Sequence, residues 1–323
     1  MRRGCLFGGL AAVLLVMGSL GWLLGGWWIS GPLTKDTEFV VPDGSSLRDV
    51  AAKLEGEKVI SSAESFRLRA RIFGAGGAIK AGEFLLPKGA SPAKVLSILT
   101  GDDVVRRFVT VPEGMPSIMV QERLMAQPVL TGSVEVPPEG SVLPDTYDVE
   151  RGESRQAVLL RMQAAMQRTL AELWAKRSAD TVARTPGEAL ALAAIVEKET
   201  GKPSERATVA GLYSNRIRQG IMLQADPTII YPITRGKPLG RRIRQSEIQA
   251  INDYNTYSMV GLPKGPITNP GRASIEAVLH PARTDVLYMV ADGTGGHAFA
   301  TTLEQHNANV QKWFAIRKAR GDF

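Results

Sequence analysis

The sequence predicts an α+β protein with a single N-terminal transmembrane helix. Three features support this prediction: an uncharged apolar run at residues 5–29, a short strand–turn–helix pattern that recurs between residues 38 and 124, and capped helices separated by Gly- and Pro-rich loops from residue 140 to 323. With 44% hydrophobic and 22% charged residues, the composition excludes a wholly disordered chain.

Residues 5–29 are long enough to cross a membrane. As a helix they span about 37 Å at about 1.5 Å per residue, and a bilayer core is about 30 Å thick. Arg2 and Arg3 precede the run, and tryptophans typical of a membrane interface lie near its end: Trp22, Trp27 and Trp28. The positive-inside rule places residues 1–4 in the cytoplasm and the bulk of the chain beyond the inner membrane, in the periplasm of a bacterium.

A cleaved signal peptide is the alternative for the same run, with Ser19 and Gly21 as a small-residue cleavage site. The apolar region of a signal peptide usually spans about 7 to 15 residues. This run is longer, which favours a retained anchor.

Charge and cysteine content exclude several kinds of site. The net charge of +7 is mild, and an exported domain meets lipid head groups and cell-wall polymers instead of nucleic acid. Cys5 is the single cysteine, so no intramolecular disulfide can form, and three histidines without a cysteine partner leave little material for a zinc site. We therefore predict no metal site and no nucleic-acid partner.

One small unit recurs three times in the first half of the chain. Each copy has a β-rich stretch, a Pro-x-Gly turn, and then Val and Leu at 8 and 12 positions after the Pro, which is Pro42, Pro87 or Pro112. Val and Leu four positions apart lie on one helical face, so each copy is predicted to form a strand, a tight turn and a helix. These units make up an accessory module predicted over residues 36–127.

The Pro-rich stretch from Pro128 to Glu139 lacks periodicity and is predicted to be the boundary to a second domain at residues 140–323. Within that domain, Ser154 to about Ala175 is predicted to be an amphipathic packing helix. Its apolar stripe consists of Leu159, Met162, Met166 and Leu170.

A second helix is predicted from Pro186 to Thr200. Thr185 to Glu188 has the pattern of a capping box, and Gly201 and Pro203 are stop signals. At about 100° of rotation per residue, four residues of this helix lie along one stripe. Three are apolar and the fourth is a glutamic acid: Leu192, Ile195, Val196 and Glu199.

A carboxyl group within an apolar stripe has its pKa raised by desolvation, which a general acid working near neutral pH requires. Glu199 is therefore the candidate acid, whereas Glu197 points away from the stripe. The alternative is a solvated or ion-paired Glu199, with a nearby cation as its partner: Lys198, Lys202 or Arg206.

Several sequence blocks from this helix onward resemble the endolytic murein transglycosylases of bacterial inner membranes. The blocks are Ala194–Thr200 (AIVEKET), Asn215 with Arg216, Leu223–Thr228 (LQADPT) with Tyr231, Tyr254–Tyr257 (YNTY), Gly261–Pro263 (GLP), Pro266–Gly271 (PITNPG), Gly296–Phe299 (GHAF) and His306 with Asn307. The anchor, Val41–Gly44 and Leu143–Tyr147 are also similar, whereas Thr234–Arg244 departs from the family's pattern.

The resemblance implies an enzyme that cleaves the β-1,4 bond between N-acetylmuramic acid and N-acetylglucosamine within nascent glycan strands. The products of that family carry 1,6-anhydro ends, and the cleavage terminates strand elongation. Glu199 is the second Glu of the block E-K-E-T and is implied as the catalytic acid. The resemblance also implies a LysM-like module upstream and no cofactor, and it makes cell-wall synthases candidate partners.

Polar side chains in the Gly- and Pro-punctuated loops are candidates for binding the sugar strand. They are Gln224, Asp226, Asn255, Tyr257, Asn269 and His297. Turn formation or backbone capping is the alternative for each of them. His297 either orients Glu199 or is a structural residue of a hairpin predicted over residues 287–301.

Two rival functions stay open on the sequence alone. One is a non-enzymatic peptidoglycan-binding scaffold of the cell-wall synthesis machinery. The other is a glycoside hydrolase with two carboxylates, in which Asp226 or Asp145 partners Glu199.

Overall fold

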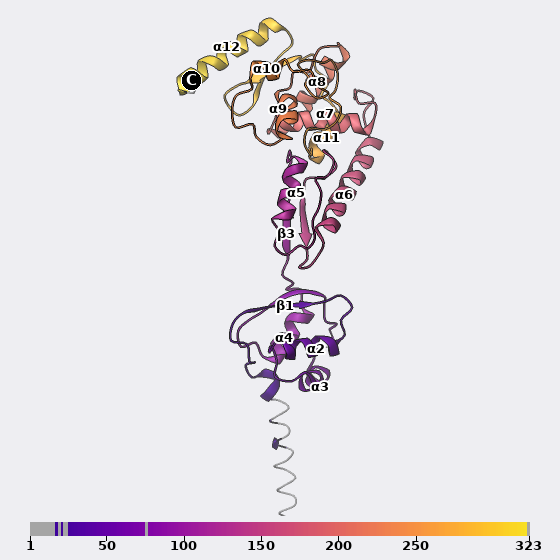
Figure 1. Ribbon diagram of the computed structural model, residues 1–323, viewed down its shortest axis with the longest axis vertical. Coiled ribbons are helices and arrows are strands. Elements are labelled where there is room, and N and C mark those ends of the chain that lie inside the picture. Colours follow the sequence, from indigo (N-terminus) through magenta and orange to yellow (C-terminus); the bar gives the residue numbers. More distant parts are fainter. Residues whose placement is uncertain (1–16, 19–20, 22–24, 75–76, 322–323) are drawn as a thin grey trace, which may run out of the picture. The chain divides into compact units, whose positions relative to one another are not determined.

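The computed structural model describes residues 17–18, 21, 25–74 and 77–321, and the chain divides into two compact units, Met1–Arg107 and Phe108–Phe323 (Figure 1). The fold is α+β, with small two-stranded sheets and many helices. Most of the predicted transmembrane helix, residues 5–29, lies outside the described residues. Among the helices that are described, none is both long and apolar enough to cross a bilayer.

The first unit packs helices against a two-stranded sheet. Strand β1 (Thr37–Val41) pairs antiparallel with β2 (Gly82–Leu86), with Thr37 opposite Leu86. The helices are α2 (Leu47–Gly56), α3 (Ala63–Phe73) and α4 (Pro92–Thr100). Each helix begins after a serine whose hydroxyl accepts a hydrogen bond from the backbone three residues on, at Ser46, Ser62 and Ser91.

The first two copies of the repeated unit form as predicted. Gly44 and Gly89 have φ of 72° and 67°, the left-handed conformation that a glycine allows in a Pro-x-Gly turn. The Val and Leu of both copies are buried in the core of the unit: Val50, Leu54, Val95 and Leu99.

Trp27 is also part of this core, which corrects its predicted place in an aromatic belt. Its side chain is 3% exposed, and its ring centre lies 5.7 Å from that of Phe66. Trp28, by contrast, is 57% exposed. A residue of the uncharged run is thus packed into the folded unit.

The third copy belongs to the second unit, so the boundary lies at residues 107 and 108 and not after residue 127. Its strand β3 (Arg107–Thr110) pairs with β4 (Thr146–Val149), and its helix is α5 (Ser117–Met125). Val120 and Leu124 of α5 share a core with α6 (Arg155–Ala175). The Pro-rich stretch at 128–139 packs into the same core, and for this reason it is not a linker.

The remaining elements follow in a largely helical domain. They are α7 (Pro186–Glu199), the 3₁₀ turn η1 (Pro203–Glu205), α8 (Arg206–Arg218), α9 (Asp226–Thr234), α10 (Gln245–Ile248), α11 (Arg272–Leu279), β5 (Tyr288–Ala291), β6 (His297–Ala300) and α12 (Leu303–Arg320). Strands β5 and β6 form the predicted antiparallel hairpin, with Ala291 opposite His297. The stretch from Gly261 to Gly271 has no regular structure, as predicted.

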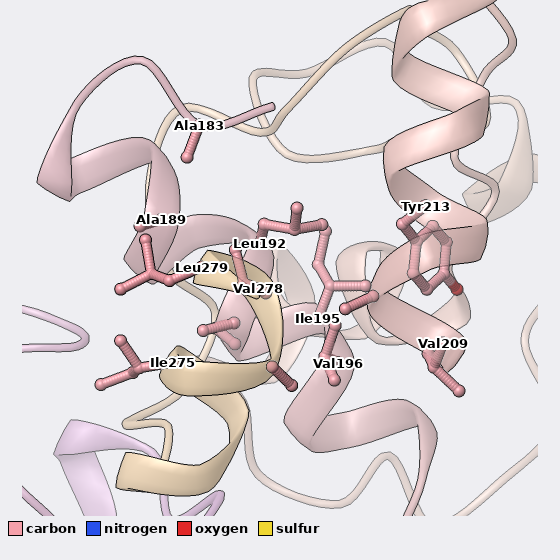
Figure 2. Packing of buried hydrophobic residues seen from close by; sticks show 14 of the residues in the cluster. Ala183, Ala189, Leu192, Ile195, Val196, Val209, Tyr213, Ile275, Val278 and Leu279 are labelled. Atoms are coloured by element: carbon pink, nitrogen blue, oxygen red, sulfur yellow. The ribbon is translucent and has the colours of Figure 1, made fainter. Parts of the chain in front are cut away.

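Helix α7 lies at the centre of this domain. Figure 2 shows its Leu192, Ile195 and Val196 packed among residues of α8 and α11: Val209, Ile275, Val278 and Leu279. Its alanines at 191, 193 and 194 are also buried, and small side chains allow neighbouring helices to approach closely. Burial on all sides fixes the helix firmly, and with it the residue at its C-terminal end.

The start of α7 is capped nearly as predicted. The Thr185 hydroxyl accepts a hydrogen bond from the Glu188 backbone at 3.1 Å. The Glu188 carboxylate accepts from the backbone of Arg184, one residue earlier than in a standard capping box.

Candidate active site

Glu199 is the last residue of α7 and is only partly exposed. The helix ends there because Thr200 turns into an extended conformation, and the chain then forms η1. A side chain at this position is held by the buried helix that precedes it.

The surroundings of Glu199 raise the pKa of its carboxyl group into the neutral range, so both the acid and the carboxylate are populated near pH 7. Burial raises its pKa to about 7, and the negative charge of Asp226 contributes to the rise. A hydrogen bond from Tyr213 and the positive charge of Arg216 oppose this rise. The raised pKa agrees with the prediction from the apolar stripe, and it suits a group that donates a proton at neutral pH.

Tyr213 and Arg216 lie on α8 and were not among the predicted site residues. Tyr213 is 2% exposed, and its hydroxyl donates a hydrogen bond to the Glu199 carboxylate. The two residues are three positions apart and share one helical face. Two sequence signals could have indicated them: Arg216 lies in a block that resembles the family, and Tyr213 precedes it by three positions on the same helix.

Arg216 anchors the loop that follows α8. Its guanidinium donates hydrogen bonds to the backbone carbonyls of Met222, Leu223 and Leu287 at 2.7 to 3.1 Å, and it lies over the ring of Tyr288. Its Nη1 also lies 3.5 Å from Gln224 Oε1, so the same guanidinium contacts one of the candidate site residues. Its charge reaches Glu199 through space, where it favours the carboxylate.

Asp226 and Tyr257 form a pair beside Glu199. The Tyr257 hydroxyl donates a hydrogen bond to Asp226 Oδ1 at 2.6 Å, and Asp226 opens helix α9. Burial and this bond raise the pKa of Tyr257 above its ordinary range. Asp226 is exposed, so it is accessible to a ligand while its charge acts on Glu199.

Gln224 is exposed and has a left-handed backbone, with φ of 52°. Few residues other than glycine adopt this conformation, and such strain is often found at functional sites. The surrounding backbone is fixed by Thr256, whose carbonyl accepts from Gln224 N and whose hydroxyl accepts from Ala225 N. These bonds join the Leu223–Thr228 and Tyr254–Tyr257 segments.

Asn255 and Asn269 are fully buried and support loops. The Asn255 amide donates to three backbone carbonyls of the segment 247–250, and its oxygen accepts from the Tyr257 backbone. Asn269 accepts from Val142 N and donates to Met115 O. In this structure neither asparagine offers a polar atom to a ligand, which agrees with the alternative of backbone capping.

His297 forms its side-chain hydrogen bond with Glu205 and none with Glu199. Its Nδ1 lies 2.8 Å from Glu205 Oε2, and its backbone N–H donates to Oε1 of the same carboxylate. Burial raises the pKa of Glu205, but the bonds from His297 outweigh it, and the net pKa lies below the ordinary value. The pair fixes the β5–β6 hairpin to η1, close in sequence to Glu199.

We expect Glu205→Gln to destabilise the domain by about 1–3 kcal/mol, because a buried hydrogen-bonding group loses its matched partner. The ionised Glu205 carboxylate contributes to the free energy of unfolding of the wild type. This contribution is fully present above the ordinary pKa near 4.5 and is lost as the pH falls through the lowered pKa. Denaturant unfolding at pH 7 and at acid pH measures both effects. Equal stability of the two proteins at pH 7 would contradict this role.

Glu197 faces different partners from those of Glu199, as the helical wheel predicts. Its Oε2 accepts from the backbone N–H of Gly271, the residue that caps α11, at 2.9 Å. Its other oxygen lies 3.7 Å from Arg206, which also binds Glu113. Glu197 thus joins α7 to α11.

We expect Glu197→Gln to retain activity, because a glutamine oxygen can still accept from Gly271. Stability should fall by about 1 kcal/mol with the loss of the charge facing Arg206. Turnover of isolated glycan strands measures the first outcome. A folded variant without activity would place Glu197 in the chemistry.

Glu139 is a second carboxyl group with a raised pKa, about 7, mainly because of burial. Its Oε1 accepts from the backbone N–H of Ser117 at 2.8 Å. That bond caps α5, where Pro116 at the N-cap provides no side-chain acceptor. A capping role therefore accounts for Glu139.

Asp145, the other candidate for a second carboxylate, also has a local role. Its Oδ1 accepts from the backbone of Thr146 at the start of β4. Among the described residues, no three His, Cys, Asp or Glu side chains gather in an arrangement that could hold a metal ion.

Together these features define a class of protein: an α+β domain in which a glutamic acid with a raised pKa lies at the end of a buried helix, beside a tyrosine donor and an aspartate. Comparison with known proteins identifies the family. The pattern of the YceG-like family matches residues 39–312, and the chain belongs to that family.

Individual relatives agree with this assignment. The endolytic murein transglycosylase of Bacillus subtilis is 25% identical over 339 residues, which cover 92% of this chain and 93% of that protein. The endolytic murein transglycosylase of Streptococcus pneumoniae is 34% identical over 178 residues, 53% of this chain and 31% of that protein. A crystal structure of a putative yceG-like protein from Listeria monocytogenes superposes with a TM-score of 0.53 at 25% identity, over 85% of this chain and 98% of that one.

Proposed function

We propose that this chain is an endolytic peptidoglycan lytic transglycosylase with Glu199 as its catalytic acid and base. The observation that carries the proposal is the partly exposed carboxyl group of Glu199, whose pKa is raised to about 7, in a chain whose relatives bear the name endolytic murein transglycosylase. The substrate is a glycan strand, and the bond broken is the β-1,4 bond from N-acetylmuramic acid to N-acetylglucosamine.

In the first step, Glu199 donates its proton to the glycosidic oxygen. The bond between that oxygen and the anomeric carbon of the muramic acid breaks, and the glucosamine leaves as an alcohol. Positive charge develops at the anomeric carbon. The Glu199 carboxylate left behind is stabilised by Tyr213 and by the charge of Arg216.

In the second step, the 6-hydroxyl of the same muramic acid attacks the anomeric carbon. The Glu199 carboxylate takes the proton of that hydroxyl, a 1,6-anhydro ring forms, and the acid is regenerated. An intramolecular nucleophile has a high effective concentration, so no bound water and no second catalytic carboxylate are required. One carboxyl group therefore suffices for the whole cycle.

The exposed polar groups around Glu199 are suited to binding the sugar strand. Asp226 with Tyr257, and the strained Gln224, lie on adjoining segments tied together by Thr256. We assign these groups to hydroxyl and N-acetyl recognition, with His297 at the margin of the site. Asn255 and Asn269 act indirectly by holding the loops.

Digestion of purified peptidoglycan tests the function. Fragments with 1,6-anhydromuramic acid ends, identified by mass spectrometry, are the expected product. Reducing ends would instead support a hydrolase in which Asp226 acts as the second carboxylate, since its charge acts on Glu199. Absence of any cleavage would support a peptidoglycan-binding scaffold.

The N-terminal part is assigned to placing the enzyme at the membrane. The uncharged run that begins at Cys5 would form a single-pass anchor of the inner membrane and end before residues 25–29, which pack onto the first unit, with the catalytic domain in the periplasm. The strand–turn–helix units of residues 36–107 would serve as a LysM-like accessory module for glycan. Cell-wall synthases, which produce the strands that the enzyme cleaves, are the expected partners.

A further inference from the structure

The chain enters the first unit without a flexible linker. Ile29 N donates to Gly25 O in a helical turn, and the Gly26 carbonyl accepts from the Arg69 side chain. Trp27 is buried in the core. Gly31 N then donates to Gly89 O. The end of the uncharged run is thus fixed to the folded unit through its backbone and its side chains.

The surface beside this entry is apolar. Trp28 and Ile29 are 57% and 66% exposed, and on α3 Leu68 and Ile72 are 46% and 51% exposed. The Trp28 ring lies 5.2 Å from that of Phe73, the last residue of α3, so the two segments are adjacent. We call the exposed set Trp28, Ile29, Leu68, Arg71 and Ile72 the α3 face.

The outer side of α3 also carries positive charge. The helix contains three arginines and one acidic residue, Glu64 in its first turn. Arg69 is buried, whereas Arg71 is exposed and Arg67 is partly exposed. Exposed apolar side chains together with arginines are typical of a surface that rests in the head-group region of an anionic bilayer.

We infer that the α3 face lies against the outer leaflet of the membrane that holds the anchor. The inference rests on the proposed anchor, which begins at Cys5. About 20 apolar residues suffice to cross a bilayer, so a span beginning at Cys5 reaches the far interface just before the rigid turn at residues 25–29. Trp28 and Ile29 then lie at the level of the head groups, and Leu68 and Ile72 lie beside them.

This contact would fix the orientation of the first unit relative to the membrane. In Figure 1, α3 and residues 25–28 lie at one end of that unit, and β1 lies at the other. Leu85 of β2 is 51% exposed, equal to Ile72, and pairs with Glu38 of β1. Leu85 is therefore a matched control position for Ile72.

Site-directed fluorescence on the full-length chain in liposomes tests the inference. Cys5 is the single native cysteine, so Ile72→Cys and Leu85→Cys in a Cys5→Ser background each carry one label. The liposomes contain phosphatidylcholine and phosphatidylglycerol with a nitroxide on the head group. We expect the nitroxide to quench the label at residue 72 several-fold more than the label at residue 85.

A label on native Cys5 separates failure of the inference from failure of the anchor. If the Cys5 label is quenched and the labels at 72 and 85 respond equally, the chain is anchored and the α3 face is free, which overturns the inference. If the Cys5 label is not quenched, the anchor fails and the inference fails with it. Digestion of peptidoglycan by the same preparations reports on the enzyme independently.

Two further measurements address the charge and a competing occupant. Arg67→Gln with Arg71→Gln should reduce the quenching at residue 72 in liposomes with phosphatidylglycerol and have little effect in phosphatidylcholine alone. The competing occupant of the α3 face is a second copy of the chain. Disulfide cross-linking of Ile72→Cys to itself, with no quenching by lipid, would overturn the inference in favour of that dimer.

Discussion

Replacing Glu199 by Gln should abolish the formation of anhydro-ended fragments. The glutamine amide can neither protonate the leaving oxygen nor accept the proton of the 6-hydroxyl, so both steps lose their proton carrier. General acid–base catalysis contributes about 10² to 10⁴-fold, and the loss should be at least of that size. Mass spectrometry of peptidoglycan digested by equal amounts of the two proteins gives the measurement.

The same variant should fold at least as well as the wild type above neutral pH. Burial disfavours the charged form of Glu199, so wild-type stability falls as the pH rises from the ordinary pKa of 4.5 to the raised value of about 7, and the full penalty is present above pH 7. A neutral glutamine removes that penalty, and thermal unfolding at pH 8 detects the difference. Anhydro products from a folded Glu199→Gln protein would remove Glu199 from the mechanism.

Glu139→Gln is the matched control, because Glu139 is the other carboxyl group with a pKa raised to about 7 by burial. A glutamine oxygen can still accept from Ser117 and cap α5. Activity should therefore survive. If Glu139→Gln loses all activity and Glu199→Gln retains it, the acid has been assigned to the wrong residue.

Local signals in the sequence were sufficient to locate the candidate acid. Thr185 and Pro186 mark the start of α7, and the apolar stripe marks its buried side, so the position of Glu199 follows from about four turns of one helix. The elevated pKa follows from the same pattern because desolvation depends mainly on apolar neighbours. The hairpin β5–β6 and the first two strand–turn–helix units are local in the same sense.

The partners of Glu199 come from other segments, and the sequence indicated them only in part. Asp226, at the start of α9, was one of two candidate partners, whereas Tyr213 of α8 was missed, because such contacts exist only once the helices have packed. The roles of Asn255 and Asn269 depend on contacts of the same kind, and polar residues in loops look alike in sequence whether they face a ligand or a backbone. The burial of the side chain in the folded protein distinguishes the two cases.

The boundary between the units illustrates the same limit. The third strand–turn–helix copy is indistinguishable in sequence from the first two, yet its Val120 and Leu124 pack with α6. A Pro-rich stretch at 128–139 has the composition of a linker, but Leu130 and Val134 within it are buried. A Pro-rich composition indicates that a segment lacks regular secondary structure, but it does not indicate whether the segment packs into a core.

The pH dependence of catalysis should reveal the state of Glu199. A general acid must be protonated, so kcat/KM should be highest below the pKa of about 7 and should fall as the pH rises through it. Two neighbours of Glu199 shift this alkaline limb of the pH profile, the range in which kcat/KM falls, in opposite directions. The negative charge of Asp226 raises the pKa, and the hydrogen bond from Tyr213 lowers it.

Asp226→Asn should therefore move the alkaline limb of the profile to lower pH, and Tyr213→Phe should move it to higher pH. A displacement of one unit changes the rate on the limb about tenfold, so at pH 8 the Asp226→Asn variant should be clearly the slower of the two. The side-chain oxygen of the introduced asparagine can still accept the hydrogen bond of Tyr257, which limits structural disturbance.

A merely structural role for either residue would lower kcat/KM equally at every pH and leave the position of the limb unchanged. If the alkaline limbs of both variants shift in the same direction, or if neither shifts, Asp226 and Tyr213 do not set the pKa of Glu199. The chemical role proposed for these two residues would then have to be abandoned.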